Sequence, residues 1–406
     1  MKIRLVICVV SAISLASFVA ARSIPEKLSP VIFVPGDGGS QVEAKLNKPN
    51  VVHYICQKQS DWFNIWLNME LLVPVVIDCF IDNMRLIYDN VTRKSYNPPG
   101  VEVRMPGWGN PEVVEWIDPS HSSTGKYFQD ISQALIPLGY ERMKSIRGAP
   151  YDFRKAPNEN KQWFSDMKDL IEDTYTLNND TAVTIISHSM GSPMTMVLLQ
   201  QLPDEWKNKY IRRVISLAGA WAGSIKAVKV FAMGDDLGSF ALSGKTLRPL
   251  QISYPSMSWL LPSPLFWKPN EVLVETPDRQ YTMAQLKEFL ADLDYTTGWE
   301  MRKDTITYSL NFSPLNVEVH CLYGTGLDTV EKLRYKKSVS VSEKPTLVMG
   351  DGDGTVNSRS LQSCKYWEQF QTQKIYSKGF DKAEHMGILT NADVIKYIVD
   401  VLSIET

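Results

Sequence analysis

A strand that turns at once into a helix constrains the fold of this chain more than any other feature. The β-branched run 183–187 leads directly into His188-Ser189-Met190-Gly191, and an apolar helical candidate follows at 192–202. So abrupt a turn needs small side chains two positions before and two after Ser189, because larger ones would collide with the strand or the helix. Ser187 and Gly191 meet this requirement. The segment therefore predicts a buried strand and a helix joined by a tight turn with Ser189 at its tip.

Other short apolar runs alternate with helical patterns along the chain. Because buried strands that alternate with helices pack as a parallel sheet with helices on both faces, the expected fold class is α/β. The expected strands are 30–34, 183–187, 214–217, 317–323 and 345–349, and helices are expected at 125–138, 161–175 and 192–202.

Two stretches interrupt this alternation. Residues of about 47–119 are rich in Trp, Pro and paired acidic side chains, and residues of about 221–315 are rich in Pro, Trp and Ser. We interpret both as insertions in one large domain, 22–406, that form a cap over the carboxyl edge of the sheet. The 406 residues would also accommodate two average domains.

The first 21 residues predict a secretory signal peptide. Met1-Lys2-Ile3-Arg4 precedes an apolar run from Leu5 to Val19 and then Ala20-Ala21, which is the order of charge, apolar core and small residues in such signals. A membrane anchor is the alternative, but a span needs about 20 apolar residues.

The cysteines and the glycosylation sequons agree with an oxidising compartment. Beyond Cys8 in the signal, an even number of cysteines remains, which allows three disulfide pairings or free buried thiols. Pairing Cys56 with Cys79 and Cys321 with Cys364 closes the shorter loops and is favoured. Sequons for N-glycosylation begin at Asn90, Asn179 and Asn311.

Ser189 is a candidate nucleophile, which requires an imidazole base and a carboxylate that orients it. In this kind of site both follow the serine, the acid first. Only His320 and His385 lie downstream; His320 sits within an expected strand, so His385 is the candidate base. The acid is Asp351 or Asp353, with Asp353 favoured. A calcium loop at this point lacks the required closing ligands.

Two backbone amides are candidates for an oxyanion hole. One belongs to Met190, directly after the serine, and the other to Asp37 in the glycine-rich loop 35–39 that follows the first expected strand. A phosphate-binding loop is the rival reading of this segment, but the Lys-Ser/Thr ending and the dinucleotide spacing are both missing. The formal net charge of −2 gives no electrostatic reason to expect nucleic acid. We expect no cofactor and no metal.

Taken together, these residues resemble the lecithin:cholesterol acyltransferase family, and its lysosomal phospholipase A2 branch in particular. The resemblance covers nearly the whole mature chain and is carried by the segments 34–37, 43–46, 65–68, 78–83, 147–152, 188–191, 321–326 and 352–357. It implies an α/β-hydrolase fold, a Ser189-Asp353-His385 triad and an oxyanion hole from Asp37 and Met190. It also implies a phospholipase A and acyltransferase that uses water or a lipid alcohol as acceptor, in the lysosome or secreted.

The resemblance further implies a membrane-binding subdomain at about 47–88 and a cap and lid formed by about 89–119 with 221–315. The side chains expected to enter a lipid surface are Trp62, Phe63, Trp66, Leu67, Leu71 and Leu72. Ordinary core packing is the alternative for them. The mobile part of the lid is expected near Gly234-Asp235-Asp236.

Asp37 and Met190 distinguish branches of the family. The sterol-acylating plasma branch looks to carry cysteine at the position of Asp37 and leucine at the position of Met190, whereas this chain resembles the lysosomal branch at both. A secreted phosphatidylcholine:sterol acyltransferase is the alternative within the class, and a catalytically inactive lipid-transfer protein is the alternative outside it. The chain departs from the family pattern at 218–223, which lacks a proline, and at Asp236 in place of asparagine. Both departures leave substrate range open.

Overall fold

A parallel sheet forms the base of the molecule. The computed structural model describes residues 28–122, 125–238 and 242–403, so the predicted signal peptide lies outside it. Neighbouring strands of the sheet all run parallel, in the order β15-β12-β9-β8-β1-β7. The strands are β1 (Val31–Val34), β7 (Ile146–Gly148), β8 (Val183–His188), β9 (Ile211–Leu217), β12 (Glu318–Thr325) and β15 (Ile375–Asp381). The predicted α/β class is confirmed.

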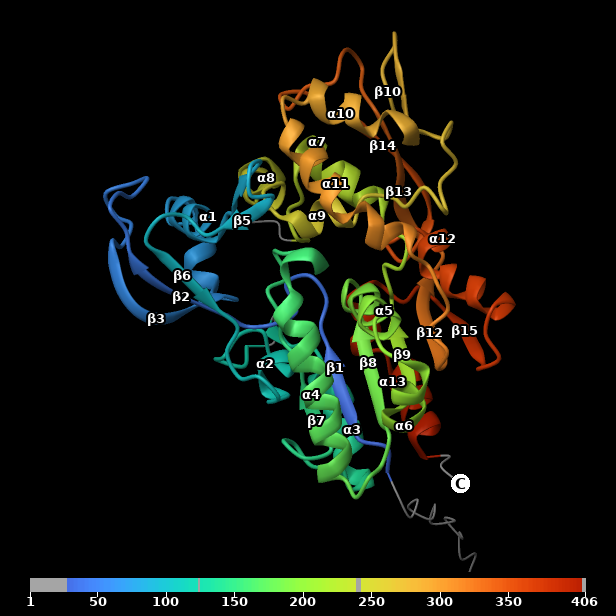
Figure 1. The fold of residues 1–406 in the computed structure, drawn as a ribbon. Coiled ribbons are helices and arrows are strands. Elements are labelled where there is room, and N and C mark those ends of the chain that lie inside the picture. The colour runs from blue at the N-terminus through green and yellow to red at the C-terminus, as the bar shows by residue number, and fades with distance from the viewer. Residues whose placement is uncertain (1–27, 123–124, 239–241, 404–406) are drawn as a thin grey trace, which may run out of the picture.

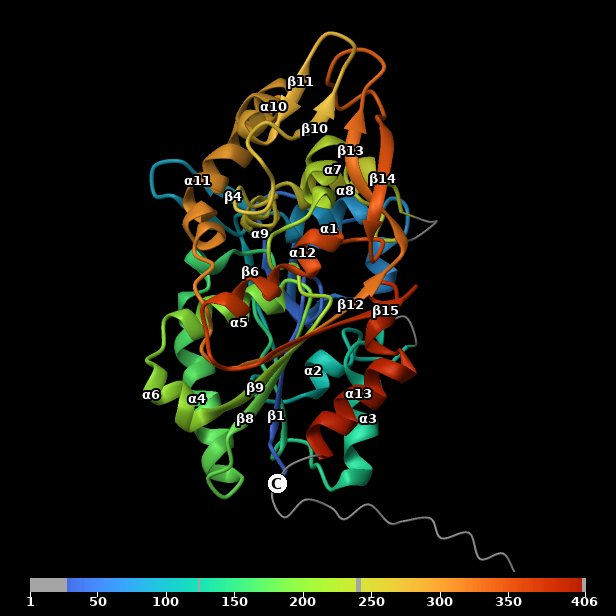
Figure 2. The ribbon, with the colours of Figure 1, turned by 90° about the vertical axis from the view of Figure 1, so that its right-hand side faces the viewer.

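Helices cover both faces of this sheet. Figure 2 shows α4 (Lys161–Leu177) and α6 (Asp204–Tyr210) on one side, and α3 (Gln129–Leu135) and α13 (Ala392–Ser403) on the other. Strands β1 and β8 are buried along their whole length, which explains why they read as continuous apolar runs. Helix α5 (Gly191–Gln200) begins at the turn after β8 and is buried from Gly191 to Leu199.

Two strands of the sheet had no clear sequence signal. β7 has only three residues, and β15 lies at the sheet edge with polar, partly exposed side chains, so neither shows an apolar run. The expected strand at 345–349 exists as β14 (Thr346–Gly352), but it belongs to a second sheet and is largely exposed.

The first insertion is built on a small antiparallel sheet, seen at the left of Figure 1. It consists, in this order, of β3 (Gln59–Trp66), β2 (Val42–Asn47) and β6 (Val101–Arg104). The helix of this insertion is α1 (Ile77–Met84). The predicted cap segment 89–119 is divided. Its strand β6 joins this sheet, whereas Arg93 forms ion pairs with Glu300 and Asp304 of the second insertion.

The second insertion lies above the carboxyl ends of the main strands (Figure 1). Its sheet has the order β11-β10-β13-β14 and extends past the predicted boundary at residue 315. The strands are β10 (Val272–Glu275), β11 (Gln280–Thr282), β13 (Leu327–Arg334) and β14. The helices are α7 (Ile225–Met233), α8 (Gly244–Gln251), α9 (Pro255–Trp259), α10 (Leu286–Asp292) and α11 (Thr296–Leu310).

Short elements complete the described chain. They are η1 (Met69–Leu72), β4 (Ile87–Asp89), β5 (Lys94–Tyr96), α2 (Glu112–Glu115), η3 (Ile136–Leu138), η4 (Pro157–Glu159), η5 (Met283–Gln285), α12 (Ser358–Leu361), η6 (Ser363–Gln369) and η7 (Gly387–Leu389). Within residues 28–122, 125–238 and 242–403, no helix combines the length and the apolar character that a membrane span requires.

Both disulfides of the favoured pairing are present. Cys56 is bonded to Cys79, which attaches the loop before β3 to α1, and Cys321 of β12 is bonded to Cys364 of η6. The sequon residues Asn90, Asn179 and Asn311 are all exposed, so their glycosylation remains a sterically open prediction.

Candidate active site

Ser189 lies at the tip of the turn between β8 and α5. Its φ of 51° is a left-handed backbone conformation that a serine adopts only under strain. A Cβ atom at Gly191 would come within 2.4 Å of the carbonyl oxygens of Val34 and Pro35, so only glycine fits there. Ser187, where glycine or alanine is commoner, is accommodated because its hydroxyl forms a hydrogen bond of 3.0 Å with Ser192.

The structure brings Ser189, His385 and Asp353 together at the carboxyl ends of the strands. The Nε2 atom of His385 is 2.9 Å from the Ser189 Oγ, and its Nδ1 atom is 2.7 Å from the Asp353 Oδ2. A carboxylate can only accept a hydrogen bond, so the His385 Nδ1 carries the ring proton. The unprotonated Nε2 is then able to accept the proton of Ser189. This geometry can generate a serine nucleophile.

Asp353 is buried and held as a carboxylate. Its Oδ1 accepts hydrogen bonds from the amides of Val356 and Thr355, at 2.7 and 3.0 Å. Burial alone would raise its pKa, but the neighbouring His385 and these amides hold the pKa of Asp353 below its usual value. Asp351 is exposed and accepts instead from the Gly326 amide and Ser358, so it does not contact His385.

The loop after β1 lies against the serine. A Cβ atom at Gly36 would be 2.7 Å from the Ser189 Cβ, so glycine is what allows this approach. Within the described part of the chain, neither the Asp37 amide nor the Met190 amide donates to a protein acceptor. Two free N–H groups beside the serine suit the stabilisation of a developing oxyanion.

Asp37 is an exposed side chain that nevertheless has much protein around its carboxylate. Burial raises its pKa to about 6, Lys226 of α7 opposes this shift, and Asp235 adds to it. Asp235 itself is buried and bonded to Lys229 at 2.8 Å, and its backbone is paired with Gln251 of α8. The backbone at Gly234-Asp235 is therefore tied to its neighbours.

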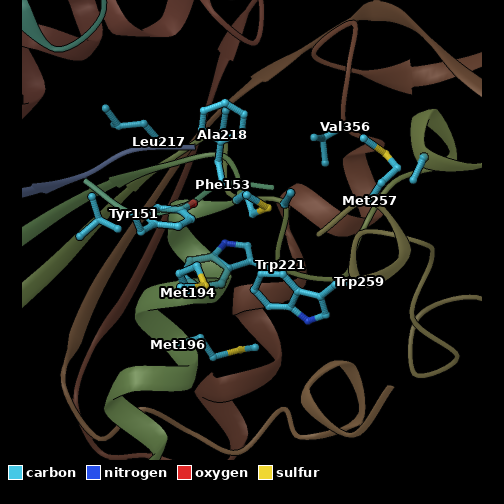
Figure 3. Close-up of a cluster of buried hydrophobic side chains, with 14 of the residues drawn as sticks. Tyr151, Phe153, Met194, Met196, Leu217, Ala218, Trp221, Met257, Trp259 and Val356 are labelled. Atoms are coloured by element: carbon cyan, nitrogen blue, oxygen red, sulfur yellow. The ribbon is translucent and has the colours of Figure 1, made fainter. Parts of the chain in front are cut away.

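Apolar side chains of α5 and of the chain around residues 221 and 259 gather in a buried cluster, as Figure 3 shows. Trp221 and Trp259 lie near Met194 and Met196 of α5 in this cluster, and all four are buried. Trp221 also packs edge-on against Trp367, with ring centroids 5.1 Å apart. The departure at 218–223 therefore contributes Trp221 to this apolar cluster, and its backbone meets the nucleophile, because the Ala220 amide donates to the Ser189 carbonyl at 3.2 Å.

The first insertion contacts the loop 35–39 through Trp66. The side chains predicted to enter a lipid surface need correction. Leu67 and Leu72 are 7% and 6% exposed and belong to the core. Phe63, Trp66 and Leu71 pack against that core, and Trp62 lies under Arg104 at 4.2 Å. Sequence could not separate these from surface residues, because the stretch that forms β3 and η1 supplies both buried and exposed side chains. The exposed apolar side chains nearby are Val52, Tyr54, Ile55, Met69, Val73 and Val75.

Sequence reasoning also missed two side chains that support the loop 35–39. The Trp66 indole donates to the Gly38 carbonyl at 2.8 Å, and the Tyr127 hydroxyl accepts from the Gly36 amide at 3.0 Å. Sequence assigned Trp66 to a lipid surface and gave no signal for Tyr127, because each reaches the loop from a distant part of the chain.

The fold and the site together define a serine hydrolase of the α/β-hydrolase class. Ser189 lies at a strand-to-helix turn of a parallel sheet, and it is hydrogen-bonded to His385, which Asp353 orients. A chain in the crystal structure of the Tle4-Tli4 complex supports the fold: it has a TM-score of 0.51 at 12% identity and covers 93% of this chain and 99% of its own length.

The family model for lecithin:cholesterol acyltransferase matches residues 62–392. Human lysosomal phospholipase A and acyltransferase is 42% identical over 92% of this chain and 90% of the human protein. Chicken phosphatidylcholine-sterol acyltransferase is 37% identical over 89% of this chain and 87% of the chicken protein. The chain therefore belongs to the lecithin:cholesterol acyltransferase family.

Proposed function

We propose that this chain is a phospholipase A and acyltransferase that acts on glycerophospholipids in the lysosome or after secretion. The observation that carries the proposal is the hydrogen-bonded order Ser189-His385-Asp353 next to the two free amides of Asp37 and Met190. The name of the human relative, lysosomal phospholipase A and acyltransferase, supports the lipid substrate and the compartment.

In the first half of the reaction, Ser189 attacks the ester carbonyl of a phospholipid. His385 takes the Oγ proton as the bond forms, and Asp353 stabilises the imidazolium. The Asp37 and Met190 amides donate to the oxyanion of the tetrahedral intermediate. When that intermediate collapses, His385 returns the proton to the leaving lysophospholipid, and the acyl group stays on Ser189.

In the second half, an acceptor hydroxyl attacks the acyl-enzyme. His385 deprotonates the acceptor, the same two amides hold the oxyanion, and the proton returns to Ser189. Water as acceptor releases a fatty acid, whereas a lipid alcohol such as ceramide yields a new ester. The apolar side chains around Trp221 and Trp259 are suited to hold the acyl chain, because the methylene groups of the substrate would be removed from water when they pack against them (Figure 3).

A lipid surface is the proposed partner of the first insertion. In place of the buried Leu67 and Leu72, the contacts would come from exposed side chains of the disulfide-closed loop, Met69, Val73 and Val75. The first insertion contacts the loop of Asp37 through Trp66, so its exposed apolar side chains would bring the site to the membrane where its substrate lies.

The test uses phosphatidylcholine liposomes that contain both ceramide and cholesterol, at about pH 4.5 and about pH 7.4. Wild-type protein is expected to release fatty acid and to acylate ceramide, mainly at the acidic pH, and Ser189→Ala is expected to do neither. Equal product from both proteins would end the assignment of Ser189.

The same assay separates the two alternatives. Cholesteryl ester as the main product would favour a sterol acyltransferase, as in the chicken relative. Lipid exchange between liposomes without any new product would favour a transfer protein, although the complete Ser189-His385-Asp353 set argues against one.

A further inference from the structure

His188 and Tyr127 are two buried polar residues that the proposed reaction does not use. His188 is the last residue of β8, directly before Ser189, and Tyr127 lies just before α3. They are 1% and 2% exposed, and their rings meet edge to face with centroids 5.3 Å apart. Polar groups buried so completely are in most cases hydrogen-bonded to one another or to the backbone.

Their hydrogen bonds form one chain whose direction is determined by chemistry. The His188 Nε2 atom is 2.9 Å from the His385 carbonyl oxygen, which can only accept, so Nε2 carries the proton. In the neutral ring, Nδ1 must then accept, and it lies 2.5 Å from the Tyr127 hydroxyl, which therefore donates. The same hydroxyl oxygen accepts from the Gly36 amide at 3.0 Å.

The ends of this chain are the two loops that must meet at Ser189. Gly36 directly precedes Asp37, and a Cβ atom at Gly39 would be 2.6 Å from the Tyr127 ring, so the loop is seated on that ring. At the other end, the His385 backbone is held on both sides: its N–H donates to the Asp353 carbonyl at 3.0 Å and its carbonyl accepts from His188.

We infer that Tyr127 and His188 are positioning residues, which hold the Asp37 loop and the His385 loop at the right separation on either side of Ser189. The inference rests on the proposed function of this site. Neither residue touches the reacting atoms. Both act because hydrogen-bond donors aimed at the oxyanion are effective only when they are held in place before the reaction begins.

The neutral state of His188 is stable over the working range of pH. Burial, with the nearby His385 as a second cause, lowers the pKa of His188 to about 3. Burial also raises the pKa of Tyr127, so its hydroxyl keeps its proton. The direction of the hydrogen bonds is therefore the same in an acidic and in a neutral compartment.

Three variants and one control test the inference. Tyr127→Phe removes the link to Gly36 and to Nδ1, and His188→Met removes both links of the imidazole. His188→Gln keeps an amide N–H that can reach the His385 carbonyl, so it should retain more activity than His188→Met. Tyr140→Phe is the control, because Tyr140 is equally buried and its hydroxyl donates to the Ser29 carbonyl, away from the site.

The readouts are kcat and KM on phosphatidylcholine liposomes and the rate at which a p-nitrophenyl phosphonate labels Ser189. We expect Tyr127→Phe and His188→Met to lower kcat and the labelling rate by about tenfold or more, as for the loss of a buried hydrogen bond, with KM nearly unchanged. Tyr140→Phe should leave both rates unchanged. Tyr127→Phe with wild-type rates would overturn the inference, as would equal losses in the control.

Nitrogen NMR of histidine-labelled protein gives a readout that depends on no activity. His188, assigned by the signal missing from His188→Gln, should show a protonated Nε2 and an unprotonated Nδ1 from about pH 4 to about pH 8. Titration of this ring within that range would contradict the inference. If wild-type protein and Ser189→Ala give equal lipid product, the proposed function fails, whereas the NMR spectrum and the phosphonate labelling still test the positioning role.

Discussion

Replacement of Asp353 by asparagine should disable the site through the tautomer of His385. The Asp353 Oδ1 accepts hydrogen bonds from the amides of Val356 and Thr355, at 2.7 and 3.0 Å. These two donors would orient the asparagine so that its oxygen faces them and its NH₂ group faces the His385 Nδ1. Since an NH₂ group cannot accept, Nδ1 would lose its proton and Nε2 would carry it. Nε2 could then no longer receive the proton of Ser189.

The size of the effect follows from this wrong tautomer. Serine hydrolases with the corresponding change lose about 10⁴-fold in kcat, or about 5 kcal/mol of transition-state stabilisation. We expect a loss of this order in fatty acid release from phosphatidylcholine liposomes, with KM little changed because Asp353 is buried away from the substrate. The folded state should persist, since asparagine has nearly the same shape.

Asp351→Asn is the matched control. It lies two residues away, is exposed, and bonds Gly326 and Ser358 instead of His385, so its replacement should leave kcat within about threefold of the wild-type value. An Asp353→Asn protein that keeps more than a tenth of the wild-type kcat, or an Asp351→Asn protein that loses as much as Asp353→Asn, would refute the reasoning.

Further predictions concern pH, the first insertion and its disulfide. Because burial raises the pKa of Asp37 to about 6, its carboxyl is neutral below that pH and negative above it, where the charge opposes the oxyanion; kcat/KM should fall as pH rises through about 6, and an unchanged acidic optimum in Asp37→Asn would contradict this. Leu67→Ala should lower the free energy of unfolding in urea by about 2–5 kcal/mol because Leu67 is 7% exposed. Val73→Asp should change stability by less than about 0.5 kcal/mol because Val73 is 47% exposed, yet reduce activity on liposomes and spare a soluble ester; equal loss on both substrates would argue against a lipid contact. Paired Cys56→Ser and Cys79→Ser replacements should cost about 3 kcal/mol in urea unfolding, from a sequence separation of 23, and an unchanged midpoint would show that the bridge does not restrain the unfolded chain.

Local patterns were enough to predict the turn at Ser189 and the class of the fold. The small residues at Ser187 and Gly191 stand within a few positions of Ser189, so the pattern is visible locally, although the contact that requires glycine at 191 is with the carbonyl oxygens of Val34 and Pro35. The buried strands β1 and β8 are apolar throughout because helices cover both of their faces. Each of these patterns lies within a few consecutive residues, so the sequence displays it directly.

Features that depend on which face of an element meets another were decided only by the tertiary structure. Asp351 and Asp353 are two residues apart, one near the end of β14 and one just after the strand, and their different partners separate them: His385 for Asp353, Gly326 and Ser358 for Asp351. Strand β14 reads like a strand of the main sheet but pairs antiparallel with β13 in the second sheet, because an apolar run predicts a strand and does not specify its partner. The burial of Leu67 likewise comes from packing across elements.

The support of the Asp37 loop is the clearest case of such dependence on tertiary structure. Trp66 and Tyr127 reach Gly38 and Gly36 from two other parts of the chain, and no spacing in the sequence relates them. Sequence by itself determined which residues can carry the chemistry, because that depends on residue type and order along the chain. Only the tertiary structure decided what holds them in place, because hydrogen bonds between distant segments exist only once the chain has folded.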